Sequence, residues 1–482
     1  MNAQPLLSGA DYQPLTTLKS LRDVFVVETI KLWRIAGLIV LNLLCIFGVN
    51  SITLIFVGHL GELELSAVSI ALLVVGTFVF GFLLGMGSAL ETLCGQAFGA
   101  GHVNMLGIYL QRSWIILLST SVLLLPLYVF ATPILKILGQ ADDIAELAGK
   151  FAILTIPRGF ALAINFPTQK FLQAQSKVLV LAWIGLVALV AHAAMTWCFV
   201  FKLNLGLLGA AMAYNVTYWL ISIAQVAYIV FWLKDGWSGL SWVAFKDLWA
   251  FVRLSFASAV MLCLEVWYLM SVVIVTGNLN NSEIAIDALS VCLNFNGIEV
   301  MVFIGINAAI SVRVSNELGR GRPRAAKYSV YVTVFQSFII GLICMIGVLI
   351  AKDYIAILFT NSEAVRIAAS KLAFLLGITM VLNSVQPVLS GVAVGGGWQA
   401  TVAYINVGCY YIFGLPLGVA LGYIANLGVA GIWGGMIAGL ALQTLLLLIV
   451  IYRTNWEKEV EQSAERLLKW GGQQPRRDVD NS

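Results

Sequence analysis

Twelve long apolar segments, separated by short polar stretches, decide what this chain can fold into. A helix needs about 20 apolar residues to cross the hydrocarbon core of a bilayer, and each segment is long enough. Only 11% of the 482 residues are charged, whereas an average soluble domain has about 25%. The sequence therefore predicts an all-α integral membrane protein in a lipid bilayer and excludes a soluble globular fold. The 12 predicted transmembrane helices are centred near Leu43, Phe80, Leu118, Ala161, Val190, Ile221, Leu262, Phe295, Ile340, Met380, Phe413 and Leu442.

The basic residues indicate which side of the membrane each loop occupies. Cytosolic loops carry an excess of Lys and Arg. Most of the 28 basic residues fall on one side of the membrane if both chain ends lie in the cytosol. We therefore expect a cytosolic tail at residues 1–28 and another at residues 453–482. The strongest single anchor is the cluster of Arg313, Arg320, Arg322, Arg324 and Lys327.

The chain also repeats itself at an offset of about 220 residues. Two halves with the same even number of helices have the same orientation, and such parallel repeats place the substrate site between them. We therefore predict two pseudo-symmetric six-helix lobes, at residues 29–233 and 248–452, joined by a cytosolic linker at residues 234–247. The matching pairs include Gly85 and Gly305, Gly99 and Gly319, Pro167 and Pro387, and the stretches LGLLG at 205–209 and LGVAG at 427–431.

One carboxylate, Glu265, lies in the middle of the apolar run at residues 248–275. A charge at that depth costs about 2.5–3.5 kcal/mol on insertion scales, so a stabilising interaction or a function must account for it. Met261, Glu265 and Tyr268 fall on one face of a helix. Our hypothesis is that this face lines a water-accessible cavity in which Glu265 binds a proton or a cationic substrate. The alternative is a buried structural hydrogen-bonding role.

Further polar residues fall on the eighth predicted span. Asp287 opens the span, Asn294 follows seven residues later on the same face, and Glu299 lies deeper. Intramembrane carboxylates are functional candidates by default. The alternatives are that Asp287 caps the helix at the interface and that Glu299 pairs with a basic or amide group of a neighbouring helix.

Two amides, Asn383 and Gln386, precede a proline in the tenth predicted span. Pro387 frees a backbone carbonyl and permits a kink. A kinked helix with two amides suits contact with a polar solute, and the alternative is hydrogen bonding between helices. The aromatic pair Trp267 and Tyr268 adjoins Glu265 and suits stacking on flat solutes or cations, with ordinary packing as the alternative.

No motif points to an enzyme or to a nucleotide-driven pump. The glycine-rich stretches at 99–101 and 395–397 lack the Lys-Ser/Thr of a phosphate-binding loop. The three histidines are scattered and the seven cysteines show no paired spacing, so we expect no metal or other cofactor. The net charge of +4 reflects loop topology and indicates no nucleic-acid partner. Energy for transport is expected from an ion gradient.

Six motifs follow one another along the chain: GHLGELELS at 58–66, CGQAFGAG at 94–101, KFLQAQ at 170–175, CLEVW at 263–267, RVSNELG at 313–319 and QPVLSGVAVGGGWQ at 386–399. In this order they make the chain resemble the plant multidrug and toxic compound extrusion (MATE) family, also called DETOXIFICATION proteins. The resemblance covers the whole chain except its extreme ends.

The resemblance implies two six-helix lobes around a V-shaped cavity and export of organic solutes by alternating access, against inward movement of protons. The proton-site glutamate of the eukaryotic branch matches Glu265. The aspartate that prokaryotic relatives carry in the first helix matches Thr53, so a proton site there is not expected. An aspartate of some plant relatives matches Asn383, which puts a two-carboxylate mechanism in doubt here.

The expected function is a proton-coupled antiporter, working as a monomer, that exports plant metabolites such as flavonoid glycosides, or xenobiotics. Its partners are a small organic solute, protons and the bilayer. The form NSVQP at 383–387 resembles the branch that handles flavonoid glycosides at the vacuolar membrane, which we prefer to the plasma membrane. The alternative is a channel or uniporter for chloride or an organic acid, and Arg158 keeps that alternative open.

Overall fold

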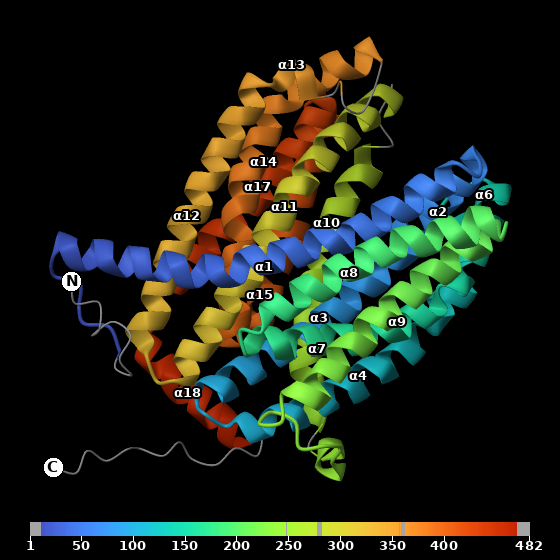
Figure 1. Ribbon diagram of the computed structural model, residues 1–482. Coiled ribbons are helices and arrows are strands. Elements are labelled where there is room, and N and C mark those ends of the chain that lie inside the picture. The colour runs from blue at the N-terminus through green and yellow to red at the C-terminus, as the bar shows by residue number, and fades with distance from the viewer. Residues whose placement is uncertain (1–10, 247, 277–281, 356, 358–361, 470–482) are drawn as a thin grey trace, which may run out of the picture. The chain divides into compact units, whose positions relative to one another are not determined.

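The computed structural model describes residues 11–246, 248–276, 282–355, 357 and 362–469, and each regular element in these ranges is a helix (Figure 1). The long helices are α1 (Leu18–Gly58), α3 (Thr77–Gly99), α4 (Val103–Val129), α7 (Ile156–Ala174), α8 (Val178–Trp197), α9 (Gly206–Trp232), α10 (Leu248–Thr276), α11 (Ser282–Gly319), α12 (Pro323–Ile350), α14 (Glu363–Gly396) and α17 (Gly428–Arg453). The shorter ones are α2 (Glu62–Ile70), α5 (Ala131–Ile137), α6 (Asp142–Leu154), α13 (Lys352–Ile355), α15 (Gln399–Asn406), α16 (Leu415–Val419) and α18 (Trp456–Lys469).

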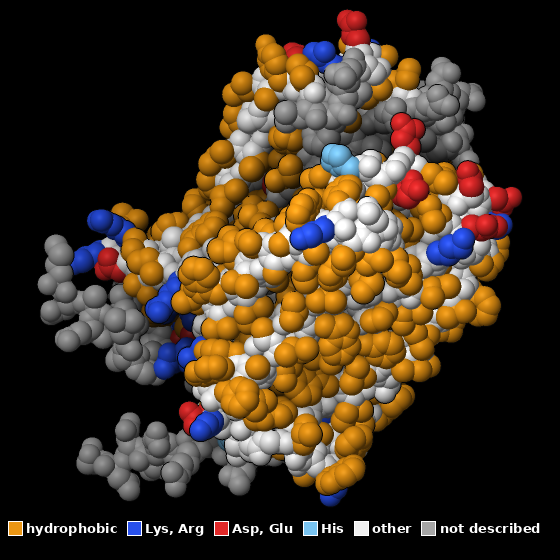
Figure 2. All heavy atoms as spheres, turned by 45° about the vertical axis from the view of Figure 1, so that its right-hand side comes forward, with side chains coloured by type: hydrophobic (Ala, Val, Ile, Leu, Met, Phe, Trp, Pro, Cys, Tyr) orange, Lys and Arg blue, Asp and Glu red, His pale blue; other side chains and the backbone are white. Residues whose placement is uncertain are grey.

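The predicted number of membrane spans is confirmed. Within the described residues, 11 helical stretches are long and apolar enough to cross a bilayer, and the bent pair α6 and α7 forms the twelfth. All 12 predicted centres lie in these stretches. Figure 2 shows hydrophobic side chains covering most of the visible helix surface, with charged side chains mainly toward the helix ends. This distribution is what a chain surrounded by hydrocarbon requires.

The fourth span is broken at Thr155, where α6 and α7 meet at 50°. Pro157 stands in the first turn of α7, where its missing N–H is not needed. Asn215 of α9 bridges the break, since its Nδ2 donates to the carbonyl of Leu154 at 2.7 Å and its Oδ1 accepts from the backbone N–H of Arg158 at 3.1 Å. The side chain thus replaces backbone bonds lost at the bend, and Arg158 follows immediately after it.

The internal repeat reappears in the backbone. Asn204 and Asn426, 222 residues apart, both have a positive φ, 53° and 55°. Asparagine and glycine adopt this left-handed conformation more readily than other residues. Each asparagine follows a π-helical turn, at Cys198–Lys202 and Ala420–Ile424, and precedes a glycine of positive φ, Gly206 or Gly428. The same bend therefore ends the fifth and the eleventh span.

The chain divides into two compact units. The C-unit comprises Met1–Ala36 with Met261–Ser463, and the N-unit comprises Gly37–Val260 with Ala464–Ser482. The unit boundaries fall inside α1 and α10, so each of these helices contributes to both units. This division differs from the predicted lobes at 29–233 and 248–452, and those bounds stay a prediction.

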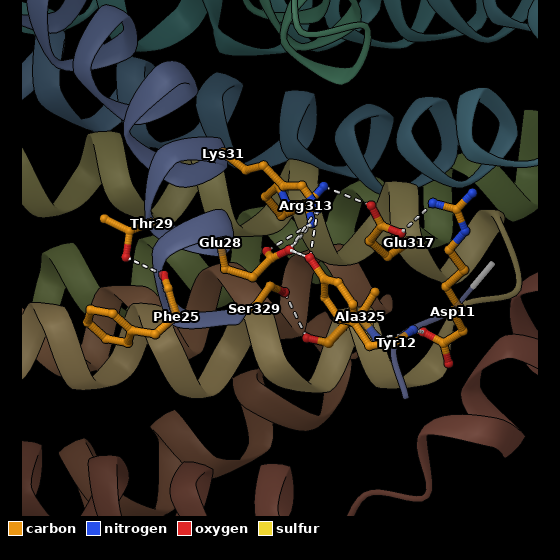
Figure 3. Close-up of polar contacts among 12 residues, drawn as sticks. Asp11, Tyr12, Phe25, Glu28, Thr29, Lys31, Arg313, Glu317, Ala325 and Ser329 are labelled. Carbon is orange, nitrogen blue, oxygen red and sulfur yellow. Dashed lines mark hydrogen bonds and ion pairs between the residues drawn. The ribbon is translucent and has the colours of Figure 1, made fainter. Parts of the chain in front are cut away.

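The segment before α1 is fastened to α12 (Figure 3). The Asp11 carboxylate accepts from the backbone N–H groups of Arg324 and Ala325, at 3.0 and 2.9 Å, and so caps the first turn of α12. The Tyr12 ring stacks on Tyr328 at 6.1 Å, and its hydroxyl donates to Glu28 at 2.5 Å. Burial and the Glu28 carboxylate raise the pKa of Tyr12, so the phenol remains a donor at neutral pH.

Glu28 belongs to a buried ionic network on Arg313 of α11 (Figure 3). The Arg313 guanidinium contacts Glu28 Oε2 at 2.9 Å and Glu317 Oε1 at 2.8 Å. Lys31 also pairs with Glu28 at 3.0 Å, and Arg320 with Glu317 at 2.9 Å. Buried charges of this kind are tolerated only when each is paired. The network joins the first turns of α1 to the last turns of α11 within the C-unit.

We predict that Arg313→Met lowers the free energy of unfolding by about 3–5 kcal/mol, because it leaves two buried carboxylates without their main counter-charge. The measurement is the melting temperature of the detergent-purified protein. Arg22→Met, on an exposed part of α1, is the matched control and is expected to stay within about 0.5 kcal/mol of wild type. An Arg313→Met protein with the wild-type melting temperature would contradict this account.

Candidate functional site

Three neutral side chains from two other helices surround Glu265 of α10. Gln386 and Ser390 of α14 donate to Glu265 Oε1 at 3.0 and 3.3 Å. Asn406, at the end of α15, donates to the same oxygen at 3.3 Å. Glu265 itself is half-buried. The structure thus brings the predicted Glu265 and Gln386 together and adds two residues that the sequence analysis did not single out.

A second layer of contacts fixes the orientation of these donors. Asn406 Oδ1 accepts from Gln443 of α17 at 3.1 Å, so its Nδ2 is turned toward Glu265 and the carbonyl of Met261. Gln386 also donates to Ser390 Oγ at 3.1 Å. Asn406 and Gln443 are fully buried. The amides are therefore held in place by packing and by each other.

The chemistry of this cluster follows from the lack of a cation. No Lys, Arg or His of the described chain forms an ion pair with Glu265. Neutral donors stabilise a carboxylate without neutralising its charge. A carboxyl group in this setting can either bind a proton or, when it is ionised, pair with an incoming cation.

The backbone at Pro387, where we predicted that a kink is permitted, is tied to α11. Asn307 donates to the carbonyl of Pro387 at 2.5 Å, one residue beyond Gln386. Asn383 turns to a different partner, because its Nδ2 donates to Asn296 Oδ1 at 3.3 Å. The two predicted amides of α14 therefore have separate roles, and only Gln386 contacts Glu265.

Tyr268 and Trp267 lie on different faces of α10. Tyr268 is fully buried, stacks on Tyr410 with the ring centres 4.3 Å apart, and donates to the carbonyl of Met436 at 3.1 Å. The rings leave no room for a solute between them. Trp267 is exposed on the neighbouring face. The Tyr268 side chain therefore packs inside the C-unit, whereas the Trp267 side chain lies on the exposed face of α10.

The remaining predicted residues lie on α11. Asn294 is exposed and donates to the carbonyl of Ser290 in its own helix at 2.8 Å. The side chain of Asp287 lies outside the described residues. Glu299 is 8% exposed, and both of its carboxylate oxygens are buried without a hydrogen-bond partner among the described residues. The pairing that we considered for Glu299 is therefore absent from that part of the chain.

The N-unit holds a polar cluster that the sequence analysis missed. Thr53 contacts His192 Nε2 at 2.9 Å, and Thr217 contacts the other ring nitrogen at 2.8 Å. All three side chains are fully buried. The signal in the sequence was a histidine inside an apolar span. Among the described residues no three His, Cys, Asp or Glu side chains gather closely enough to hold a metal ion.

Comparison with known proteins identifies the class of protein. A sequence model of the MatE family matches residues 39–198 and 257–420, once in each half of the chain. The fold and the family are those of a membrane transporter and not of an enzyme. The chain belongs to the MATE family of multidrug and toxic compound efflux transporters.

Relatives and solved structures agree with this assignment. Protein DETOXIFICATION 35 of Arabidopsis thaliana is 66% identical over 462 residues, which cover 96% of this chain and 95% of the relative. Protein DETOXIFICATION 34 of the same plant is 64% identical, over 96% and 85%. The crystal structure of the eukaryotic MATE transporter AtDTX14 has 34% identity and a TM-score of 0.88, over 92% of this chain and 100% of that one. The Vibrio cholerae transporter VcmN, at 15% identity and a TM-score of 0.79 over 92% and 99%, shares the fold.

We predict that Tyr268→Phe leaves transport intact, because among the described residues the hydroxyl bonds only to backbone carbonyls, and that it costs about 0.5–1.5 kcal/mol of stability. Tyr268→Ala opens a cavity and is expected to cost about 3–5 kcal/mol. Solute uptake and melting temperature are measured together. Loss of uptake in a stable Tyr268→Phe protein would show that the phenol contacts the solute.

We also predict that Glu299→Leu raises the free energy of unfolding by about 1–3 kcal/mol, since it removes two buried oxygens that have no hydrogen-bond partner among the described residues. Thermal unfolding in detergent measures the change. The control is Glu457→Gln, an exposed carboxylate of the same unit. A destabilised Glu299→Leu protein would mean that Glu299 has a partner beyond the described residues.

Proposed function

We propose that the protein is a proton-coupled antiporter of organic solutes with its coupling site at Glu265. The observation that carries the proposal is the set of contacts at Glu265 Oε1, which accepts from Gln386, Ser390 and Asn406 and has no cationic partner in the described chain. A carboxylate fixed by an arginine would be locked in its charged form, whereas this one is supported by neutral groups alone.

The coupling follows from competition for one acid group. When Glu265 is charged, the three donors support it and a cationic or polar solute group can approach the carboxylate. When Glu265 takes a proton, its charge disappears and the carboxyl becomes a donor itself, so the solute loses its partner. Proton binding on one side of the membrane therefore favours solute release on that side. Glu299 is proposed as a second proton-binding residue, because it is a buried carboxylate with no described partner.

The finer assignments are also proposals. Flavonoid glycosides or xenobiotics as substrates, and the vacuolar membrane in preference to the plasma membrane, are supported by the NSVQP form at 383–387. Cytosolic placement of both chain ends is supported by the distribution of Lys and Arg. We propose a monomeric transporter, since each of the units encloses its own hydrophobic core.

A second candidate function is an anion channel or uniporter for chloride or an organic acid. One observation favours it. Arg158 of the N-unit is buried in α7 and forms no ion pair with a carboxylate in the described chain. A channel has no need of an acid group that takes and releases protons, so the two functions differ in what they require of Glu265.

We predict that Glu265→Gln abolishes solute uptake driven by a pH gradient, because a side-chain amide does not take up or release a proton as the pH changes. Purified protein in vesicles is given an imposed pH gradient, and uptake of a flavonoid glycoside and of chloride is followed. Glu457→Gln is the control for the loss of one negative charge and is expected to transport as wild type. Glu265→Asp keeps the acid and is expected to retain part of the uptake.

Two results would reject parts of the proposal. Chloride flux that persists without a pH gradient and is indifferent to Glu265→Gln would favour the channel. Full gradient-driven uptake by Glu299→Leu would remove Glu299 from the proton path while leaving the role of Glu265 in place.

A further inference from the structure

A groove of the C-unit opens between α12 and α17. The helix α14 packs against both and forms the floor, to which it contributes the buried side chains of Val385 and Leu389. Phe335 and Phe338 of α12 line one wall and Leu448 of α17 lines the other, and all three are exposed. The volume of the groove is about 900 Å³, which is within the range of ligand-binding sites.

The groove is apolar along its length. Most of the described residues that line it are Val, Leu, Ile or Phe. Thr444 also lines it, but its hydroxyl already donates to the carbonyl of Leu440 in its own helix at 2.8 Å. An organic solute with several polar groups would lose its bonds to water there without gaining others. The lining therefore favours a hydrocarbon chain.

One end of the groove is basic. Tyr331, near the start of α12, and Arg453, in the last turn of α17, both line it. These helix ends lie on the same side, because a Cβ placed on Gly321, just before α12, would stand 4.0 Å from Val460 of α18, just after α17. The ammonium of Lys327 lies 5.7 Å from the centre of the Tyr331 ring. Two cations therefore belong to this end.

These two cations are available to an external anion. Neither Arg453 nor Lys327 forms an ion pair among the described residues, whereas Arg313 and Arg320 of the same unit both contact Glu317. A guanidinium presents a planar fork of donors that matches the oxygens of a phosphate, and an ammonium binds phosphate as a point charge. This end of the groove therefore suits a phosphate group.

We propose that the groove binds an anionic phospholipid, with one acyl chain over α14 and the phosphate group at Arg453 and Lys327. An anionic lipid supplies both parts that the groove calls for, and basic pockets between membrane helices bind such head groups. A zwitterionic lipid brings a cation of its own, and an apolar helix of a second copy would leave both cations unmatched. The proposal does not depend on the transported solute or on the coupling site.

The test is the thermal stability of the full chain in a neutral detergent. A ligand that binds the native state raises the melting temperature by mass action. Phosphatidylglycerol is titrated at low salt, phosphatidylcholine with the same acyl chains is the control for the head group, and glycerol 3-phosphate is the control for the chains. We expect phosphatidylglycerol to raise the melting temperature of wild type more than phosphatidylcholine does, and glycerol 3-phosphate to leave it unchanged.

The role of the cations is tested by combining Arg453→Gln with Lys327→Gln. The loss of two cations that face an anionic lipid is expected to weaken phosphatidylglycerol binding by about tenfold or more. The effect of this lipid should then fall to that of phosphatidylcholine. Lys19→Gln combined with Arg22→Gln removes two exposed positive charges of the same unit, and this control is expected to keep the difference between the lipids.

The role of the groove is tested by Val334→Trp, which fills the space beside α12 and leaves both cations in place. We expect this variant to lose the response to phosphatidylglycerol. Ile343→Trp, at an exposed position of α12 outside the groove lining, is the control and is expected to respond as wild type. If Val334→Trp does not fold, the paired Gln variant alone decides.

Three results would overturn the proposal: equal shifts with the two phospholipids, a difference between them that survives the paired Gln variant, or an equal shift with glycerol 3-phosphate. Light scattering on the same samples tests the alternative occupant, since a dimer that dissociates in Val334→Trp and ignores phosphatidylglycerol would assign the groove to a second copy. Glu265→Gln is expected to respond to the lipids as wild type, so a failure of the transport proposal would leave this one standing.

Discussion

The hydrocarbon core of a bilayer contains no water to bond with a backbone amide or a polar side chain, and the rest of this structure depends on that constraint. The backbone meets it by forming helices throughout the described spans. Where a helix breaks, a side chain takes over, as Asn215 does between α6 and α7. Buried charged side chains are likewise paired, as Arg313 is with Glu28 and Glu317. Glu299 and Arg158 have buried polar atoms without a hydrogen-bond partner among the described residues, and ionisable groups of this kind inside a span are candidates for a function.

The two units each bury a charged side chain, but the sign of the charge and the groups around it differ. In the C-unit an acidic group, Glu265, is surrounded by neutral donors that can support a charge without cancelling it. In the N-unit a basic group, Arg158, lies on aromatic rings, and its Nε has no hydrogen-bond partner in the described part of the chain. The repeat in the backbone, visible in the matching turns at Asn204 and Asn426, thus carries different chemistry in its two copies. The two copies of the duplicated scaffold therefore differ in the sign of the charge that they bury.

Much of the fold was predictable, because the membrane makes the sequence signal strong. Long apolar runs gave all 12 spans, and a lone carboxylate in such a run pointed to Glu265. The hydrogen-bond partners of Glu265 were harder to predict from the sequence. Ser390 and Asn406 are small polar residues of a kind that often bonds to its own helix, and Asn406 is 141 residues away from Glu265. Sequence spacing likewise grouped Asn383 with Gln386, whereas the packing of α11 separates them. The division inside α1 and α10 was not predicted either, since one uninterrupted helix gives no sign that its two ends pack with different partners.

The contact between Glu28 and Arg313 has a consequence for how the protein is made. The two residues are 285 positions apart, and a ribosome adds about 5–20 residues per second, so Glu28 waits roughly 15–60 s for its partner. During that time the first turns of α1 have no counter-charge from α11 and no helix α12 for Asp11 to cap. The amino end of the first span is thus made early but obtains these contacts only after α11 and the start of α12 have been synthesised. Its native position therefore depends on segments from the second half of the chain.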